Sequence, residues 1–213
     1  MVTATILLGI CAIMSYLSFD FVHGEGYEER PIVEVVVLLG LAGVLYLVVA
    51  NRALSMAPPV RTVVVVSILA RIILVVSTPI QEDDVYRYVW DGRVRAEGVN
   101  PYRYSPDNVE DIDLIPDDPR ADVDIHRLNR LLNRSEGVAT VFSRINNREY
   151  ATIYPPIAQT VFCGAALFLP EDWSALNQVR GLKAILCLFD IGTLLALIRL
   201  LQLTRRPPGQ PII

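Results

Sequence analysis

Apolar residues gather in five long segments of the chain, and most charged residues lie between the third segment and the fourth. A helix needs roughly 20 mostly apolar residues to cross a membrane, and each segment is near that length. The pattern predicts an all-α, polytopic transmembrane helix bundle of about five spans, with a long loop that contains amphipathic helices. The predicted spans cover approximately residues 2–22, 32–50, 60–80, 152–170 and 182–203.

This pattern divides the chain into three parts. Residues 1–80 hold predicted transmembrane helices 1–3, residues 81–150 form the polar loop, and residues 151–213 hold transmembrane helices 4–5 and a short tail. Hydrophobic residues make up 53% of the 213 positions, which is typical of a membrane protein. We therefore expect membrane lipids among the partners of the chain.

The charges beside the first three spans predict their orientation. Arg52 and Arg61 flank the connection between the second and third spans, whereas the connection at 23–31 is mainly acidic. The positive-inside rule then places 51–61 in the cytoplasm and the 81–150 loop outside, in a multi-pass protein of the plasma membrane. The first span has no basic region before it, so we expect it to be retained rather than cleaved as a signal.

The last predicted span carries charges at its ends and near its middle. Basic residues lie on both sides of it, so the positive-inside rule leaves the topology after residue 170 open. They are Arg180, Lys183, Arg199, Arg205 and Arg206. Asp190 lies within the span, where a charge is costly without a partner. Arg71 lies at a similar depth in the third span, and we predict that the two form an ion pair.

Several function classes lack the residues that they need. Cys11, Cys163 and Cys187 lie in apolar segments without metal or redox spacing, so we expect buried small side chains. His23 and His126 are about a hundred positions apart, which leaves little material for a zinc site or a hydrolytic triad. No glycine-rich nucleotide motif is present, and the net charge of −4 does not favour nucleic acid as a partner.

The richest chemistry lies at residues 82–104, which read EDDVYRYVWDGRVRAEGVNPYRY and directly follow the third span. If Asp84 opens a helix, the same face of that helix also carries Arg87, Tyr88, Asp91 and Arg95. Glycine favours the left-handed conformation that ends a helix, and Gly98 is placed to do so. A carboxylate face with interleaved cations suits a polar ligand. The ten arginines of residues 81–150 suit a phosphate, such as that of a lipid at the bilayer surface.

Two further parts of the loop have alternative interpretations. The acidic stretch 102–119 is either a solvated loop or a calcium site; its acidic residues are Asp107, Glu110, Asp111, Asp113, Asp117 and Asp118. Residues 122–134 have the spacing of an amphipathic helix, which either lies in the membrane interface or packs on the rest of the loop. After the loop, Pro155 and Pro156 either merely start the fourth span, or Tyr154 and Gln159 beside them line the site.

The motif EDDVYRYVWDGRVRAEGVNPY followed by YPPIAQ resembles the polytopic glycosyltransferases of the GT-C superfamily, and most closely its bacterial mannosyltransferase-like members that use polyprenyl-phosphate sugars. The resemblance is strongest over about 80–104 and 154–159. In that superfamily an acidic residue of the first large extracytoplasmic loop, often in a DD, ED or DE motif, acts at the acceptor or helps to bind a metal. The matching positions here are Glu82, Asp83 and Asp84.

The resemblance implies an inverting glycosyltransferase that moves a hexose, for instance mannose, from a polyprenyl-phosphate sugar to an extracytoplasmic acceptor. Asp84 first and Asp83 second are the expected catalytic bases. The expected substrate-binding residues are Arg87, Tyr88, Trp90, Asp91, Arg93, Arg95, Tyr154 and Gln159. A divalent cation, magnesium or manganese, is a candidate cofactor, with Asp83, Asp84 and Asp91 as its ligands.

Members of the superfamily generally have eight or more spans, so the resemblance covers an N-terminal part of such an enzyme. We therefore expect a donor-binding part elsewhere, for instance in a second polypeptide that completes the enzyme. The alternative function is a non-catalytic membrane subunit, or a transporter fragment, that binds a partner or cation through the acidic loop. Dense charge at the surface rather than in mid-membrane favours the enzyme.

Overall fold

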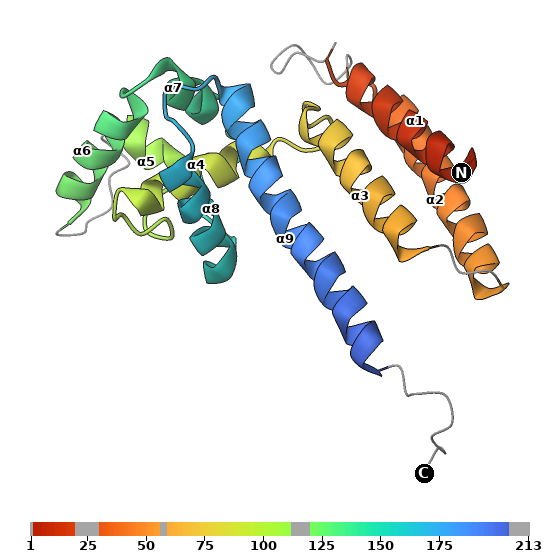
Figure 1. Cartoon of the computed structure of the whole chain (residues 1–213). Coiled ribbons are helices and arrows are strands. Elements are labelled where there is room, and N and C mark those ends of the chain that lie inside the picture. The colour runs from red at the N-terminus through yellow and green to blue at the C-terminus, as the bar shows by residue number, and fades with distance from the viewer. Residues whose placement is uncertain (1, 20–29, 56–58, 112–119, 205–213) are drawn as a thin grey trace.

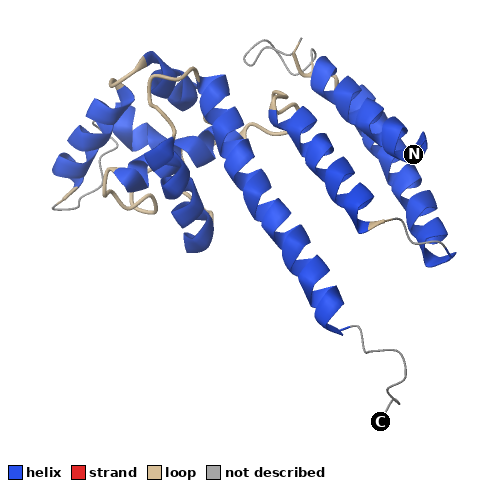
Figure 2. Ribbon diagram, in the orientation of Figure 1, coloured by secondary structure: helices blue, strands red, loops and turns tan. Residues whose placement is uncertain are grey.

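A computed structural model describes residues 2–19, 30–55, 59–111 and 120–204. Within these ranges all regular structure is helical and no strand occurs, which confirms the all-α class (Figure 2). The helices form two groups, one of long apolar helices and one of shorter helices built from the polar loop (Figure 1).

The first group comprises α1, α2, α3 and α9, which lie side by side (Figure 1). Leucine, isoleucine and valine dominate all four, and Pro59 stands just before the third, where its missing N–H costs nothing. α1 packs on both α2 and α3, and α3 packs on α9. The bounds are Val2–Leu17 for α1, Ile32–Ser55 for α2, Val60–Val75 for α3 and Ala175–Thr204 for α9.

α3 and α9 run antiparallel, with the end of α3 beside the first turns of α9. The Lys183 ammonium donates to the carbonyl oxygens of Leu74 and Ser77, each at 2.7 Å. Further along both helices the Arg71 guanidinium donates to the Asp190 carboxylate, 2.9 Å from Nε, which confirms the predicted ion pair. The chain therefore leaves α3 and enters α9 at the same end of this group.

The second group comprises the five short helices described between α3 and α9, and it has its own apolar core. Ser105 and Ser135 cap two of its helices by accepting hydrogen bonds from backbone N–H groups. Gly98, with φ of 78°, follows the first helix as predicted. The bounds are Asp84–Ala96 for α4, Pro106–Glu110 for α5, Ala121–Leu132 for α6, Glu136–Ser143 for α7 and Pro156–Phe168 for α8.

α4 and α8 form the most extensive helix pair among the described residues. A glycine allows their close approach, because a Cβ atom on Gly92 would lie 2.3 Å from the Phe162 carbonyl oxygen. The helices run in the same sense, since Asp84 meets Tyr154 just before α8 and Arg93 meets the carbonyl of Leu169 just after it.

Two described helices are long and apolar enough to cross a membrane by length and composition: Ile32–Arg52 and Ala175–Thr204. α1 and α3 have 16 residues each. α8 has 13 residues, a length of about 20 Å at 1.5 Å per residue, where the sequence predicted a span over 152–170. A hydrocarbon core is roughly 30 Å thick, so α8 is much shorter than a crossing requires.

The structure decides one open question about the loop. The apolar face of α6 packs into the core of the second group, with Ile125, Leu128 and Leu131 all buried. Of the two interpretations, a packed amphipathic helix is therefore the one observed. In the acidic stretch, Asp107 and Glu110 form ion pairs with Arg148, whereas Asp113, Asp117 and Asp118 lie outside the described residues.

Candidate functional site

The candidate site forms where the first turn of α4 meets the segment that leads into α8. The Tyr154 hydroxyl donates a hydrogen bond to Oδ2 of Asp84, with an O–O distance of 2.5 Å. Both side chains border a pocket of about 170 Å³. The pocket is lined by Asp84, Arg87, Asn146, Asn147, Tyr150, Ala151, Thr152, Ile153 and Tyr154.

A buried ion pair on α4 holds the other wall of this pocket. Arg87 donates to Oδ1 of Asp91, one turn later, at 2.8 Å, and both side chains are buried. The same guanidinium donates to the carbonyl oxygen of Tyr150 at 2.9 Å. Arg87 therefore fixes the 150–154 segment, and with it Tyr154, against α4.

Gln159 on α8 completes this network from the opposite side. Its amide nitrogen donates to Oδ2 of Asp91 at 3.0 Å and to the Thr152 hydroxyl at 2.8 Å. Its amide oxygen is buried without a hydrogen-bond partner among the described residues. Burial raises the pKa of Asp91, and the positive charge of Arg87 opposes that rise. The predicted residues Arg87, Asp91 and Gln159 thus meet, as members of one buried network behind the pocket.

Tyr88 and Tyr154 pack against each other beside the acid. Their rings meet edge to face with centroids 4.8 Å apart, and Tyr88 also stacks on Phe162 at 4.8 Å. Burial, followed by the hydrogen bond with Asp84, raises the pKa of Tyr154. Tyr154 therefore stays protonated at neutral pH, as its role of hydrogen-bond donor requires.

The two adjacent aspartates have different partners. Asp83 forms an ion pair with Arg30, just before α2, at 2.6 Å. Asp84 faces Tyr154 and the pocket. Glu82 is exposed and accepts a hydrogen bond from the backbone N–H of Asp83. Of the three acids in the motif, Asp84 is the one that lines the pocket with Arg87 and Tyr154.

Three predicted binding residues lie apart from this pocket. Trp90 is 3% exposed and packs on Phe142 of α7, with ring centroids 4.6 Å apart. Arg95 lies at the far end of α4, eleven positions from Asp84, and is partly exposed. The structure does not bring these side chains, or that of Arg93, to the pocket beside Asp84.

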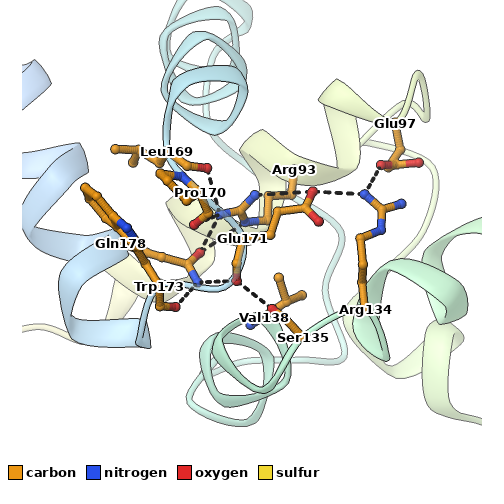
Figure 3. Close-up of polar contacts among 10 residues, drawn as sticks. All are labelled: Arg93, Glu97, Arg134, Ser135, Val138, Leu169, Pro170, Glu171, Trp173 and Gln178. Carbon is orange, nitrogen blue, oxygen red and sulfur yellow. Dashed lines mark hydrogen bonds and ion pairs between the residues drawn. The ribbon is translucent and has the colours of Figure 1, made fainter.

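Arg93 is buried in a separate polar cluster at the turn between α8 and α9 (Figure 3). It donates to the side-chain oxygen of Gln178 at 2.7 Å and to the carbonyl oxygens of Leu169 and Pro170 at 3.4 and 3.3 Å. Its guanidinium lies 3.5 Å from the Glu171 carboxylate. Burial lowers the pKa of Arg93, and the charge of Glu171 opposes this. Arg93 thus holds the turn in place.

The candidate metal ligands do not converge. Asp83, Asp84 and Asp91 are engaged by Arg30, Tyr154 and Arg87, respectively. Across the described ranges, no group of three or more His, Cys, Asp or Glu side chains is arranged to hold a metal ion. Asp83, Asp84 and Asp91 therefore do not form a metal site in this arrangement.

The sequence pattern did not indicate the residues that form the rest of the pocket lining. Asn146, Asn147, Tyr150 and Thr152 lie in the connection between α7 and α8. Asn147 has a φ of 48°, a left-handed conformation that asparagine adopts more readily than most residues. The Asn-Asn pair was the available signal, because such pairs mark turns, and turns frequently carry binding residues.

The site places an acid at a small pocket, and the described residues of the chain include two helices long and apolar enough to cross a membrane. Residues 4–117, more than half of the chain, match a family described as alpha-(1->6)-mannopyranosyltransferase, N-terminal domain. The chain belongs to this family, which confirms the resemblance to the N-terminal part of a GT-C mannosyltransferase. No curated protein and no solved structure shows significant similarity. The matched region contains α4 with Asp84, whereas Tyr154 and α8 lie beyond it.

Proposed function

We propose that this chain supplies the acceptor-activating part of a multi-pass membrane mannosyltransferase, which moves a hexose from a polyprenyl-phosphate sugar to an acceptor hydroxyl outside the cell. The observation that carries the proposal is the contact between Asp84 and Tyr154 at the edge of a small polar pocket. The membership in a mannosyltransferase family supports the reaction class.

Asp84 is the proposed general base. As the acceptor oxygen attacks the anomeric carbon, its proton passes to the Asp84 carboxylate. The bond between the anomeric carbon and the phosphate oxygen breaks, and the lipid phosphate leaves with the electron pair. A single displacement of this kind inverts the anomeric carbon. Tyr154 orients the carboxylate by donating to Oδ2, which leaves Oδ1 for the acceptor.

The pocket is suited to one sugar ring. Its volume of about 170 Å³ is below the roughly 300–1,000 Å³ of pockets for drug-sized ligands. Asn146 and Asn147 supply amides, and Tyr150 supplies an aromatic side chain beside them. Arg87 is the cation among the lining residues and is the proposed contact for a phosphate oxygen. Three expected binding residues then do not contact a sugar in this pocket but support the fold or act elsewhere in the enzyme. They are Trp90, Arg93 and Arg95.

The proposal includes two components beyond this chain: donor-binding residues and a divalent cation. The family is defined by an N-terminal domain, so we propose that donor-binding residues come from a further segment or from a second polypeptide. A divalent cation remains a candidate cofactor, but Asp83 and Asp84 would have to exchange Arg30 and Tyr154 for it. Transfer measured with and without EDTA tests that exchange directly.

The proposal is tested by sugar transfer from radiolabelled polyprenyl-phosphate mannose in membranes that contain the chain, with and without a polypeptide carrying the remaining spans. Asp84→Asn is expected to abolish transfer, because an amide cannot accept the proton. Glu149→Gln is the matched control, since Glu149 is an exposed acid near the pocket. An inserted, folded wild type that is inactive in both settings contradicts catalysis and favours a binding subunit. Full activity of Asp84→Asn excludes Asp84 as the base.

A further inference from the structure

The connection between α3 and α4, residues 76–83, leads directly into the candidate site (Figure 1). Neighbouring helices hold its first half in place. The Lys183 ammonium of α9 donates to the Ser77 hydroxyl at 2.9 Å. The backbone N–H of Thr78 donates at 3.0 Å to the hydroxyl of Ser18, a buried residue that follows α1. The chain is therefore already fixed where it leaves α3.

Arg30, which stands just before α2, fixes the second half of this connection. Its guanidinium donates to the carbonyl oxygen of Ile80 at 3.4 Å and to Oδ2 of Asp83 at 2.6 Å. The side chains of Arg30 and Asp83 are only 10% and 18% exposed, so salt screens this ion pair weakly. Ile80 also packs on Val35 of α2. The start of α2 thus holds both ends of the segment 80–83.

The three consecutive acids at the start of α4 have three different partners. Oε1 of Glu82 accepts from the backbone N–H groups of Asp83 at 2.9 Å and of Asp84 at 3.4 Å. Such groups at a helix start lack an acceptor within the helix. The Asp83 carboxylate binds Arg30, and the Asp84 carboxylate accepts from the Tyr154 hydroxyl. Each acid therefore has a separate task.

The direction of Asp83 sets the direction of Asp84. Asp83 already has helical backbone angles, with φ of −100° and ψ of −6°. Consecutive side chains of a helix point about 100° apart, because one turn takes 3.6 residues. When Arg30 holds Asp83 toward α2, Asp84 must point elsewhere, and it points to Tyr154 and the pocket. Arg30 also balances the negative charge that lies beside the proposed base.

We propose that Arg30 is a positioning residue for the sugar transfer: it holds Asp83 against the start of α2 and so directs Asp84 into the pocket. Asp83 then supports the base and does not itself take the acceptor proton. This inference rests on the proposed role of Asp84 as the general base. It adds a residue that lies far from the acidic motif in the sequence and that no pattern of spacing indicated.

The helix that carries Asp84 has anchors of its own. Tyr86 and Trp90 of α4 are buried in the core of the second group, and Gly92 packs closely on α8. Loss of Arg30 is therefore expected to leave α4 folded and to change mainly the direction of its first turn. This separates an effect on positioning from an effect on folding.

The first test is sugar transfer by Arg30→Gln, in membranes that also contain the polypeptide with the remaining spans. We expect kcat to fall by about 10- to 100-fold with little change in KM, because a misplaced base weakens the transition state rather than substrate binding. Arg134→Gln is the matched control, since Arg134 pairs with Glu97 and Glu171 away from the pocket. Arg30→Lys keeps the charge and should retain more activity. Wild-type kcat in Arg30→Gln would overturn the proposal.

A double variant separates support by Asp83 from direct participation. Arg30→Gln leaves the Asp83 carboxylate without the Arg30 charge, and adding Asp83→Asn removes that carboxylate. We expect the double variant to recover part of the lost kcat. If Asp83 takes the acceptor proton or holds a cation, Asp83→Asn and the double variant should both be as inactive as Asp84→Asn. That result, or no recovery in the double variant, rejects the assignment of Arg30 and Asp83.

The position of Asp84 can also be measured without catalysis. A single fluorotyrosine at position 154 of the extracted full chain reports on its hydroxyl by fluorine NMR. Asp84→Asn should shift the resonance, because the hydroxyl loses a charged acceptor. We expect Arg30→Gln to shift it in the same direction and Arg134→Gln to leave it unchanged.

Thermal unfolding of the same samples shows whether each variant is folded. If Arg30→Gln does not fold, Arg30→Lys provides the comparison, with a smaller shift expected in the same direction. An unchanged resonance in a folded Arg30 variant contradicts the positioning role. If the resonance shifts as expected but the wild type transfers no sugar, the positioning of Asp84 by Arg30 stands and the proposed function fails, so the two failures are distinct.

Discussion

Tyr154 donates its hydroxyl hydrogen to the Asp84 carboxylate across 70 positions of sequence, and this contact joins the two parts of the resembling motif. Asp84 opens α4, whereas Tyr154 precedes α8. The contact explains why an acid-rich stretch and a Tyr-Pro-Pro stretch belong to one site. It also yields the most direct test of how the proposed base is positioned.

Tyr154→Phe is expected to lower kcat/KM for sugar transfer by about 10- to 100-fold, because a hydrogen bond to a charged group contributes roughly 1.5–3 kcal/mol. The Tyr154 ring also packs on Tyr88, and phenylalanine preserves that packing. Thermal unfolding of the extracted protein should therefore change little. Tyr102→Phe is the matched control, since the Tyr102 hydroxyl bonds only the carbonyl of Tyr154 among the contacts described. Equal losses in both variants would contradict a specific role for the Tyr154 hydroxyl.

Gly92→Ala is expected to force α4 and α8 apart. The added Cβ would lie 2.3 Å from a backbone oxygen of Phe162, which cannot move without shifting α8. Overpacking of this kind typically costs about 1–3 kcal/mol, measurable as a lower midpoint of thermal unfolding, and transfer should fall as Tyr154 leaves Asp84. Gly164→Ala on α8 is the control, because nothing lies within 4 Å of its added Cβ. Similar midpoints for the two variants would show that the close approach is not required.

The sequence predicted a good part of this arrangement. The three-, four- and seven-residue offsets placed Asp84, Arg87 and Asp91 on one face, and these residues do line or support the pocket. The depth of two charges predicted the Arg71–Asp190 pair. The first inference depends on helix spacing, and the second depends on the free-energy cost of an unpaired charge within a membrane. Both can be read from the sequence.

What the sequence did not reveal depends on tertiary packing. Trp90 and Arg93 have the composition of ligand-binding residues, but contacts with Phe142 and Gln178 bury them. Hydropathy predicted a span over 152–170, whereas the helix formed there, α8, has 13 residues and turns the amide of Gln159 toward Asp91.

The buried Asp91 should make stability depend on pH. Burial raises its pKa above the unfolded value of about 3.9. In the window between the unfolded and folded pKa values, the folded state binds more protons, so the free energy of unfolding falls as pH rises. Below that window the effect vanishes, and above it the loss is complete. Unfolding of wild type and Asp91→Asn from pH 3.5 upward should show this downward component only in wild type. Parallel curves would contradict a raised pKa for Asp91.

The Arg71–Asp190 pair should contribute to the packing of α3 on α9. Arg71→Leu and Asp190→Leu are each expected to lower stability, because each leaves the remaining charge without its partner. Polar interactions between membrane helices average about 0.6 kcal/mol in double-mutant cycles, with maxima near 1.7, and we expect a coupling energy in that range. The exchanged pair Arg71→Asp with Asp190→Arg should recover part of the loss, measured as folded yield after detergent extraction. The carbonyl of Ser67 also accepts from Arg71, at 3.1 Å, and loses this donor on exchange, so recovery should be incomplete. Strictly additive losses and no recovery would show that the two charges act independently.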